Sequence, residues 1–192
     1  GHGAWIAKNS WGTTWAGPCG YGTEGGYFTI AYGSASIGMS SGIVSEWQAY
    51  DPRGGLLLHD DAGQNATMGV AGGLTAWSLV KHTSSADASV NRVEFWTTDV
   101  TTDVDVYLYD SFDGTAPSGL LFSRENLSFP EAGYHSLPVS PRIAVAAGDD
   151  IVALVKATNV TYTKPWSFDR HGPPDVGSSF ISQSGNAGSW VD

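Results

Sequence analysis

The chain has 192 residues, and its nine basic and nineteen acidic residues give it a formal net charge of −10 at pH 7. Such a charge repels phosphate backbones and anionic lipid surfaces, which argues against nucleic acid as a partner. The sequence shows no membrane span, and its single cysteine excludes an internal disulfide framework. Little lysine, abundant Gly, Ser and Thr, and eight Trp are typical of secreted β-proteins, so we expect an extracellular or cell-surface protein.

The first predicted element is a β-hairpin between Gly3 and Tyr32. An apolar-rich run from Ala4 to Ala7 and a β-prone run from Gly26 to Tyr32 predict two strands joined by a long, Gly-rich loop. The loop opens with the pentapeptide KNSWG at residues 8–12. Two strands alone are marginal in water, and this pair carries many large apolar side chains, so we expect the hairpin to need a partner.

The KNSWG motif, with Trp5 before it and Trp15 and the run GGYFTI after it, resembles the C-terminal end of papain-like (C1 family) cysteine peptidases. In that family the Asn and the Trp of the motif stand beside the catalytic His. A catalytic thiolate is stabilised by an imidazolium that must be held in one orientation. The resemblance therefore implies that Asn9 accepts a hydrogen bond from the imidazole and that Trp11 keeps water off this bond. The alternative is that Asn9 is a turn residue and that the Trp rings only fill a core.

The other parts of such an active site are expected outside this stretch. In the family the nucleophilic Cys begins a long helix and the His precedes the Asn, at positions that would lie before Gly1. His2 would lie on or just before the first strand, and Cys19 stands in GPCGYG, where no helix N-terminus lowers the pKa of its thiol. We therefore expect polypeptide substrates to be cleaved only by a complete peptidase.

A change in composition after Tyr32 predicts a domain boundary. The stretch GSASIGMSSG at residues 33–42 is small and polar without an apolar period, which is typical of a linker. We therefore assign residues 1–32 to the strands of a peptidase domain, 33–43 to a linker and 44–192 to a second domain. Apart from a possible calcium ion, we expect neither domain to hold a cofactor.

Four runs of the second domain have the alternation of half-buried strands. They are Asn91 to Thr98, Asp103 to Tyr109, Gly133 to Val139 and Asp150 to Ala157. Short strands separated by Gly, Pro, Asp and Asn, with almost no helical spacing, predict an all-β fold. The expected architecture is an antiparallel β-sandwich or jelly roll.

A second resemblance covers about Val44 to Asp192. The motifs YDPRG, VEFWTTD, DVDVYLYD, AGYH and AAGDDIVALVKAT, in this order, are similar to the lectin-like β-sandwich that follows papain-like peptidase domains in archaeal and bacterial surface or secreted proteins. The resemblance implies the fold of this domain. Sugar binding does not follow from the fold, because function depends on a site.

Aromatic and acidic residues of the sandwich are the candidates for such a site. Trp96, Tyr107 and Tyr109 fall on the polar faces of their strands, where exposed rings could bind a glycan, although a second layer or the peptidase domain could bury them instead. Clustered carboxylates in three predicted loops could hold calcium, but none has the spacing of a defined calcium loop, so solvated turns are favoured and no metal residue is assigned. These carboxylates are Asp60 and Asp61, Asp110 and Asp113, and Asp149 and Asp150.

The sequence supports two alternative functions. The chain is either the C-terminal portion of a secreted papain-like cysteine peptidase with an accessory lectin-like module, or a non-catalytic extracellular structural or binding protein, such as a surface or filament subunit, that retains a peptidase relic. In the first case the hairpin contacts the rest of the peptidase domain, and in the second it self-associates through its free edges.

The first prediction concerns the chain on its own. We expect residues 1–192 not to hydrolyse peptides, because the nucleophilic Cys and its His are expected elsewhere and loss of either costs orders of magnitude in rate. The measurement is turnover of a fluorogenic peptide. Turnover that a thiol alkylator blocks and that Cys19→Ala abolishes would contradict the prediction and assign Cys19 as the nucleophile.

Overall fold

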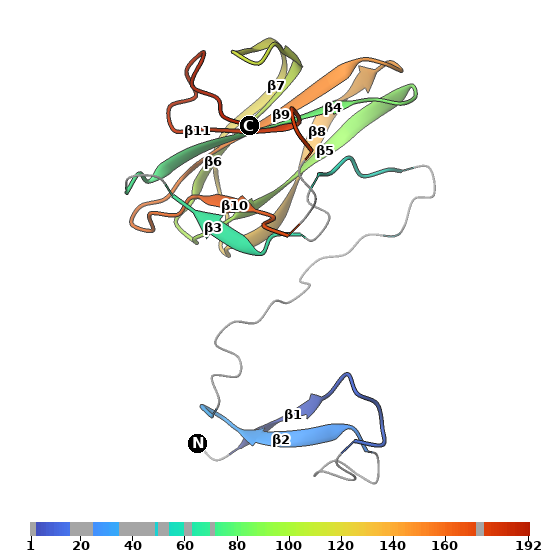
Figure 1. Cartoon of the computed structure of the whole chain (residues 1–192), viewed down its shortest axis with the longest axis vertical. Coiled ribbons are helices and arrows are strands. Elements are labelled where there is room, and N and C mark those ends of the chain that lie inside the picture. Colours follow the sequence, from blue (N-terminus) through green and yellow to red (C-terminus); the bar gives the residue numbers. More distant parts are fainter. Residues whose placement is uncertain are drawn as a thin grey trace. The chain divides into compact units, whose positions relative to one another are not determined.

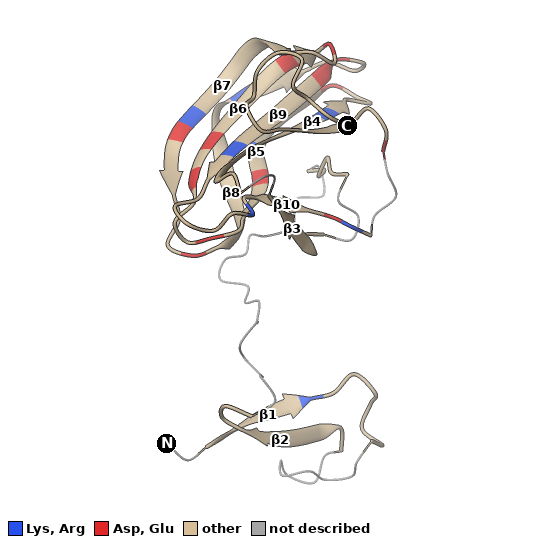
Figure 2. Cartoon of the chain, turned by 60° about the vertical axis from the view of Figure 1, so that its left-hand side comes forward, with Lys and Arg blue, Asp and Glu red and all other residues tan. Residues whose placement is uncertain are grey.

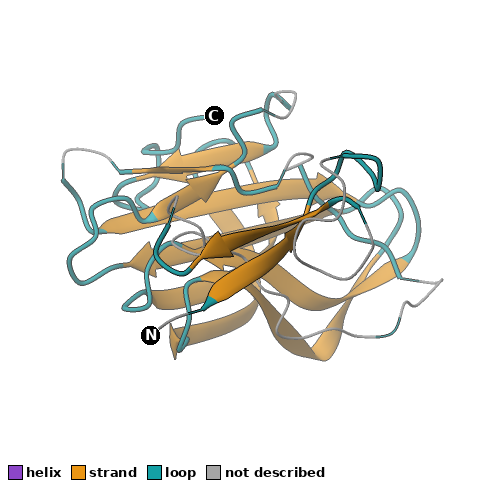
Figure 3. Cartoon of the chain, turned by 90° about the horizontal axis from the view of Figure 1, so that it is seen from below, coloured by secondary structure: helices purple, strands orange, loops and turns teal. Residues whose placement is uncertain are grey.

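The structure is a computed structural model that describes residues 3–15, 25–34, 49, 54–59, 63–69, 72–171 and 175–192. His2, Cys19, Asp60, Asp61 and most of the predicted linker lie outside the described residues. Within them the elements are all strands, the strand pairs are antiparallel and no helix occurs (Figure 3), which confirms the predicted fold class. The chain divides into two compact units, Gly1–Gly54 and Gly55–Asp192 (Figure 1).

The first unit contains the predicted hairpin, made of β1 (Ala4–Lys8) and β2 (Tyr27–Ala31). The strands pair antiparallel from Ala4 opposite Ala31 to Lys8 opposite Tyr27. Aromatic rings along the pair make edge contacts, but Trp5 is still 49% exposed and Ile6 53% exposed. The hairpin therefore buries only part of its own apolar surface.

The second unit has nine strands. They are β3 (Ala66–Met68), β4 (Thr75–Thr83), β5 (Ala88–Thr97), β6 (Asp103–Phe112), β7 (Pro117–Ser128), β8 (Gly133–Val145), β9 (Asp150–Thr158), β10 (Trp166–Phe168) and β11 (Ser179–Ser182). One sheet has the order β11-β4-β9-β6-β7, a second consists of β5 and β8, and a third of β10 and β3. The five-stranded sheet and the β5–β8 pair form the two layers of a sandwich (Figure 1).

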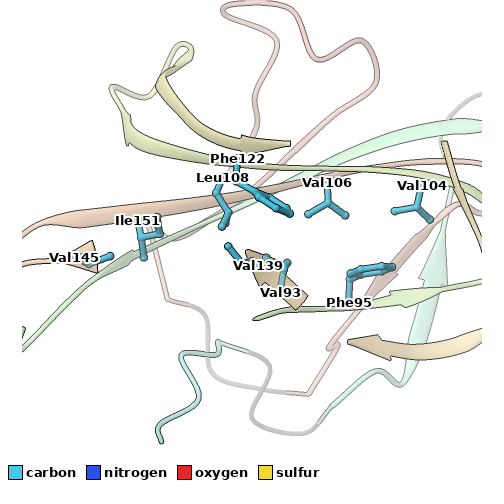
Figure 4. Close-up of a cluster of buried hydrophobic side chains, with 9 residues drawn as sticks. All are labelled: Val93, Phe95, Val104, Val106, Leu108, Phe122, Val139, Val145 and Ile151. Atoms are coloured by element: carbon cyan, nitrogen blue, oxygen red, sulfur yellow. The ribbon is translucent and has the colours of Figure 1, made fainter. Parts of the chain in front are cut away.

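The main core lies between these two layers (Figure 4). Strand alternation places Val104, Val106 and Leu108 of β6 on the inner face, opposite Val93 and Phe95 of β5. Phe122, Val139, Val145 and Ile151 complete the cluster. Burial of each such side chain stabilises the fold by about 1.5 to 3 kcal/mol relative to exposure.

The five-stranded sheet is packed on its other face as well. Residues of β9 alternate between the two clusters, with Ile151 in the inner core and Val152 and Leu154 in an outer cluster. This outer cluster also contains Leu79 and Phe112, and half-buried rings cover it. These rings are Trp77, Tyr107, Tyr109, Phe180 and Trp190. Strand β9 is consequently apolar on both faces, as the run DIVALVKA shows.

The second prediction tests the inner core with two leucines on adjacent strands. Leu108 is 1% exposed, whereas Leu120 on β7 is 56% exposed. We expect Leu108→Ala to lower the free energy of unfolding by about 2 to 5 kcal/mol, because it leaves a cavity. The matched change Leu120→Ala should cost less than about 0.5 kcal/mol, as surface substitutions usually do. Urea denaturation measures both, and equal losses would contradict the assigned layers.

Candidate functional sites

The turn after β1 holds Asn9 in a fixed position. The backbone N–H of Asn9 donates to the carbonyl oxygen of Gly26 at 2.9 Å, and its side-chain Nδ2 donates to the same oxygen at 2.8 Å. The side-chain Oδ1 accepts a hydrogen bond from the backbone N–H of Trp11. Asn9 therefore shapes the turn, which was the alternative role given by the sequence. An amide oxygen has two lone pairs, so this bond leaves Oδ1 one more acceptor position.

The turn formed by the KNSWG motif also depends on Gly26, which packs against it. A Cβ at Gly26 would lie 2.6 Å from the carbonyl oxygen of Gly12, and Gly26 has a φ of +87°. Only glycine fits this close approach without strain. The KNSWG turn and the start of the GGYFTI run are thus a single local unit, which explains why the two patterns occur together.

Trp11 is an exposed ring of this turn. It is 71% exposed, and it contacts Trp15 edge to face with ring centroids 5.4 Å apart. Trp15 in turn lies 6.0 Å from Phe28 of β2. Within the described residues, the ring of Trp11 therefore offers apolar surface for a further contact.

The three aromatic candidates of the second unit lie on two different surfaces. Tyr107 and Tyr109 of β6 point to the outer face of the five-stranded sheet, whereas Trp96 belongs to β5 in the opposite layer. On β5 it alternates with Val93 and Phe95 of the inner core, so its ring points outward. The structure brings the two tyrosines together and does not bring Trp96 to them.

On the five-stranded sheet, the polar groups around the tyrosines are already engaged. The Tyr107 hydroxyl donates to Glu125 Oε1 at 2.8 Å, and burial and this bond raise the pKa of Tyr107. Lys156 Nζ donates to Asp105 Oδ2 at 2.6 Å and lies 5.5 Å from the ring of Trp77. Figure 2 marks charged residues on β6, β7 and β9. With the tyrosines half-buried against the outer cluster, this face is largely a packed surface.

On the β5–β8 pair, the aromatic rings are more open. Trp96 lies directly opposite Tyr134 in the strand register, and their ring centroids are 5.4 Å apart at 65°. Trp96 is 36% exposed and Tyr134 52% exposed. The sequence placed Tyr134 in the predicted strand from Gly133 to Val139, which is part of β8, but did not single it out as a site residue.

Next to these rings is a fixed polar group. Ser136 Oγ donates to Glu94 Oε1 at 2.6 Å, Arg92 Nη2 donates to the Ser136 carbonyl at 3.2 Å, and Arg92 Nε donates to Ser136 Oγ. Arg92 Nε also lies 3.6 Å from Glu94 Oε1. Burial, followed by the nearby Glu94 carboxylate, raises the pKa of Tyr134 to about 12, so its hydroxyl stays protonated. We call Arg92, Glu94, Trp96, Tyr134 and Ser136 the β5–β8 face.

The loop carboxylates have structural partners. Asp113 Oδ1 accepts from the backbone N–H groups of Thr115 at 2.8 Å and Ala116 at 2.9 Å, and these bonds lower the pKa of Asp113. Asp150 Oδ1 accepts from Thr83 Oγ1 at 2.5 Å. No group of three or more His, Cys, Asp or Glu side chains that could hold a metal ion occurs among the described residues.

A pair of histidines that the sequence did not single out is formed by His82 of β4 and His59, which precedes β3 in the chain. The rings of His59 and His82 are parallel within 4° with centroids 4.2 Å apart. His59 Nδ1 lies 2.8 Å from Asp175 Oδ2, and its Nε2 lies 3.1 Å from the Lys81 carbonyl oxygen. Burial, and then the charge of His59, lowers the pKa of His82 to about 4.

Comparison with known proteins supports the β-sandwich fold of the second unit. The second unit has the two-layer antiparallel architecture of lectin-like β-sandwiches, and the family model of the lectin like domain matches residues 57–192. The chain therefore belongs to the lectin like domain family. No curated protein matches the chain. Within the part of the chain that the structure describes, no helix is long and apolar enough to cross a membrane.

One solved structure is similar to the chain. It is the crystal structure of the cysteine protease and lectin-like domains of Cwp84, a surface layer associated protein of Clostridium difficile. The likeness has a TM-score of 0.53 and 16% sequence identity, and it covers 96% of this chain and 41% of that chain. The chain thus spans less than half of the matched structure, and at this identity the likeness shows the fold alone.

The third prediction follows from the histidine pair. The unfolded chain takes up a proton on His82 near pH 6.5, whereas the folded chain resists it down to about pH 4. The stability contributed by neutral His82 is therefore present above pH 6.5 and is lost as the pH falls from 6.5 towards 4. We expect the urea midpoint to fall over this range, and His82→Gln to reduce that fall.

The control for this experiment is His171→Gln, which removes an exposed histidine. It should leave the pH dependence of the urea midpoint as it is in the unchanged chain. An identical acid loss in the His82→Gln variant would contradict the assignment to His82.

Proposed function

We propose that the chain is the C-terminal part of a papain-like cysteine peptidase that acts at or outside the cell surface, and that its lectin-like domain is an accessory binding module. In this proposal the hairpin of the first unit completes the peptidase active site. The module positions substrate or anchors the enzyme. The polypeptide substrate is cleaved by the complete protein.

The observation that carries the proposal is the fixed Asn9 turn in front of a lectin-like domain. The second unit accounts for 138 of the 192 residues, whereas the likeness to the Cwp84 structure covers 96% of the chain. The likeness therefore extends into the first unit, which contains the KNSWG turn. The Cwp84 structure also combines a cysteine protease domain with a lectin-like domain, which supports the pair of domains that we expect from the sequence.

The geometry of the turn suits an orienting role. Gly26 holds Asn9 through two hydrogen bonds, so the amide does not have to be ordered when a histidine approaches. The remaining lone pair of Oδ1 would accept the imidazole N–H without adding a charge. The exposed rings of Trp5 and Trp11 would then be covered by the rest of the peptidase domain, which also dries the hydrogen bond.

A second candidate is a non-catalytic surface or filament subunit. It is favoured by the bond from the Trp11 N–H to Asn9 Oδ1, which gives Asn9 a sufficient structural reason to be there. In this case the exposed apolar residues of the hairpin would form an interface with another molecule.

The fourth prediction tests the orienting role of Asn9 in the complete protein. Asn9→Ala should lower kcat by about 10-fold or more and shift the pH profile of kcat/KM, with little change in KM, because the imidazole loses its orientation. The control variant is Ser10→Ala in the same exposed turn, which should keep both kcat and the pH profile.

A purely structural Asn9 would give a different result. The Asn9→Ala variant would then unfold at a lower temperature but keep the kcat and pH profile of the unchanged enzyme. That outcome would contradict the orienting role of Asn9, whereas the absence of any peptidase activity in the complete protein would favour the non-catalytic candidate.

A further inference from the structure

The β5–β8 face combines two open aromatic rings with a rigid polar group. Trp96 and Tyr134 are 36% and 52% exposed, whereas Tyr107 and Tyr109 on the opposite layer are half-buried against the outer cluster. Open rings on a stiff strand pair offer a flat apolar platform at little entropic cost. The β5–β8 face is therefore the more accessible aromatic surface of the two.

The polar part of this face is pre-organised. Arg92, Glu94 and Ser136 are joined to each other by hydrogen bonds, and the cross-strand register places Glu94 opposite Ser136, beside the pair of Trp96 and Tyr134. Groups that are already ordered lose little freedom when a ligand binds. Arg92 presents donors, Glu94 presents acceptors, and the protonated Tyr134 hydroxyl presents both.

One atom of this face lacks a partner. Glu94 Oε2 is buried and has no hydrogen-bond partner among the described residues. Buried carboxylate oxygens are nearly always paired, so a hydroxyl donor from outside would relieve this one. The Tyr134 hydroxyl interacts with the Glu94 carboxylate, and Tyr134 is 52% exposed, so a ligand packed on its ring would lie beside this carboxylate.

The charge of the face and of the chain selects the class of ligand. Arg92 and Glu94 lie 3.6 Å apart and offset each other, so the face has no surplus charge. The chain as a whole has a formal net charge of −10, which repels polyanions. A ligand with apolar C–H faces and many hydroxyls, but without charge, matches both the platform and the polar group.

We propose that the β5–β8 face binds a neutral glycan chain, with a pyranose ring packed on Trp96 and Tyr134 and its hydroxyls bonded to Arg92 and Glu94. This inference deepens the proposed accessory module and rests on it, since it names the ligand class of that module. The Tyr107 side of the sandwich is not part of the site, because its hydroxyl already binds Glu125.

The test measures binding of residues 1–192 to defined probes by calorimetry. The probes are three neutral hexasaccharides (cellohexaose, chitohexaose and mannohexaose), anionic polygalacturonate, and a proline-rich peptide. We expect at least one hexasaccharide to bind. Trp96→Ala and Tyr134→Ala should each raise its Kd by about 10-fold or more, because each removes one of the two rings that form the apolar platform.

Two conservative variants distinguish the loss of a ligand contact from the loss of the fold. Tyr134→Phe keeps the ring and removes only the hydroxyl, so it should raise Kd by a smaller factor of about 3 to 5. Tyr107→Phe removes the matched hydroxyl on the opposite layer and should leave Kd unchanged. Thermal unfolding curves of all variants confirm that they are folded.

Several results would overturn the inference. They are the absence of binding to all three hexasaccharides at millimolar concentration, loss of binding in Tyr107→Phe but not in Trp96→Ala, and Trp96-dependent binding of only polygalacturonate or the peptide. None of these results changes the expected outcome of the Asn9→Ala experiment, which measures peptidase kinetics. Failure of the glycan site can therefore be distinguished from failure of the peptidase assignment.

Discussion

Strand β9 sends apolar side chains in both directions, and this constraint determines which surfaces of the lectin-like domain stay open. Ile151 enters the core shared with β5 and β8, while Val152 and Leu154 enter the outer cluster. The outer cluster is in turn covered by rings such as Phe180 of β11 and Trp190 near the C-terminus. Because the five-stranded sheet is used for packing on both faces, the outward face of β5 and β8 is the better candidate for recognition.

The same constraint explains which strands could be predicted. The four predicted runs match parts of β5, β6, β8 and β9, with Thr98 one residue past the end of β5. In these strands one face is clearly apolar or the run is continuously apolar. Strand β4 was not singled out, since Ala76 and Leu79 are buried and Trp77 half-buried, which leaves no simple alternation. Strand β7 is interrupted by register shifts and by Gly119 and Asn126 with positive φ, so its side chains lose the period of two.

The candidate sites were predictable to different degrees. Trp96 could be assigned to an outward face from the alternation of one strand alone. Its partner Tyr134 is 38 positions away, and only the pairing register of β5 with β8 places the rings together. Asn9 was recognised from a motif, but the bonds of its amide to Gly26 and Trp11 depend on a turn geometry that the motif does not specify. The histidine pair likewise forms across segments with no sequence signal.

The central claim is that the Asn9 turn completes a thiolate–imidazolium pair in the whole peptidase. The most direct measurement is the pH dependence of the rate at which iodoacetamide inactivates the complete protein. A Cys paired with an oriented imidazolium is a thiolate far below the usual thiol pKa of about 8.5, so the account predicts a rate that is already high near pH 5 and flat towards neutrality. A rate that rises only around pH 8 to 9, as for an ordinary thiol, would contradict the account.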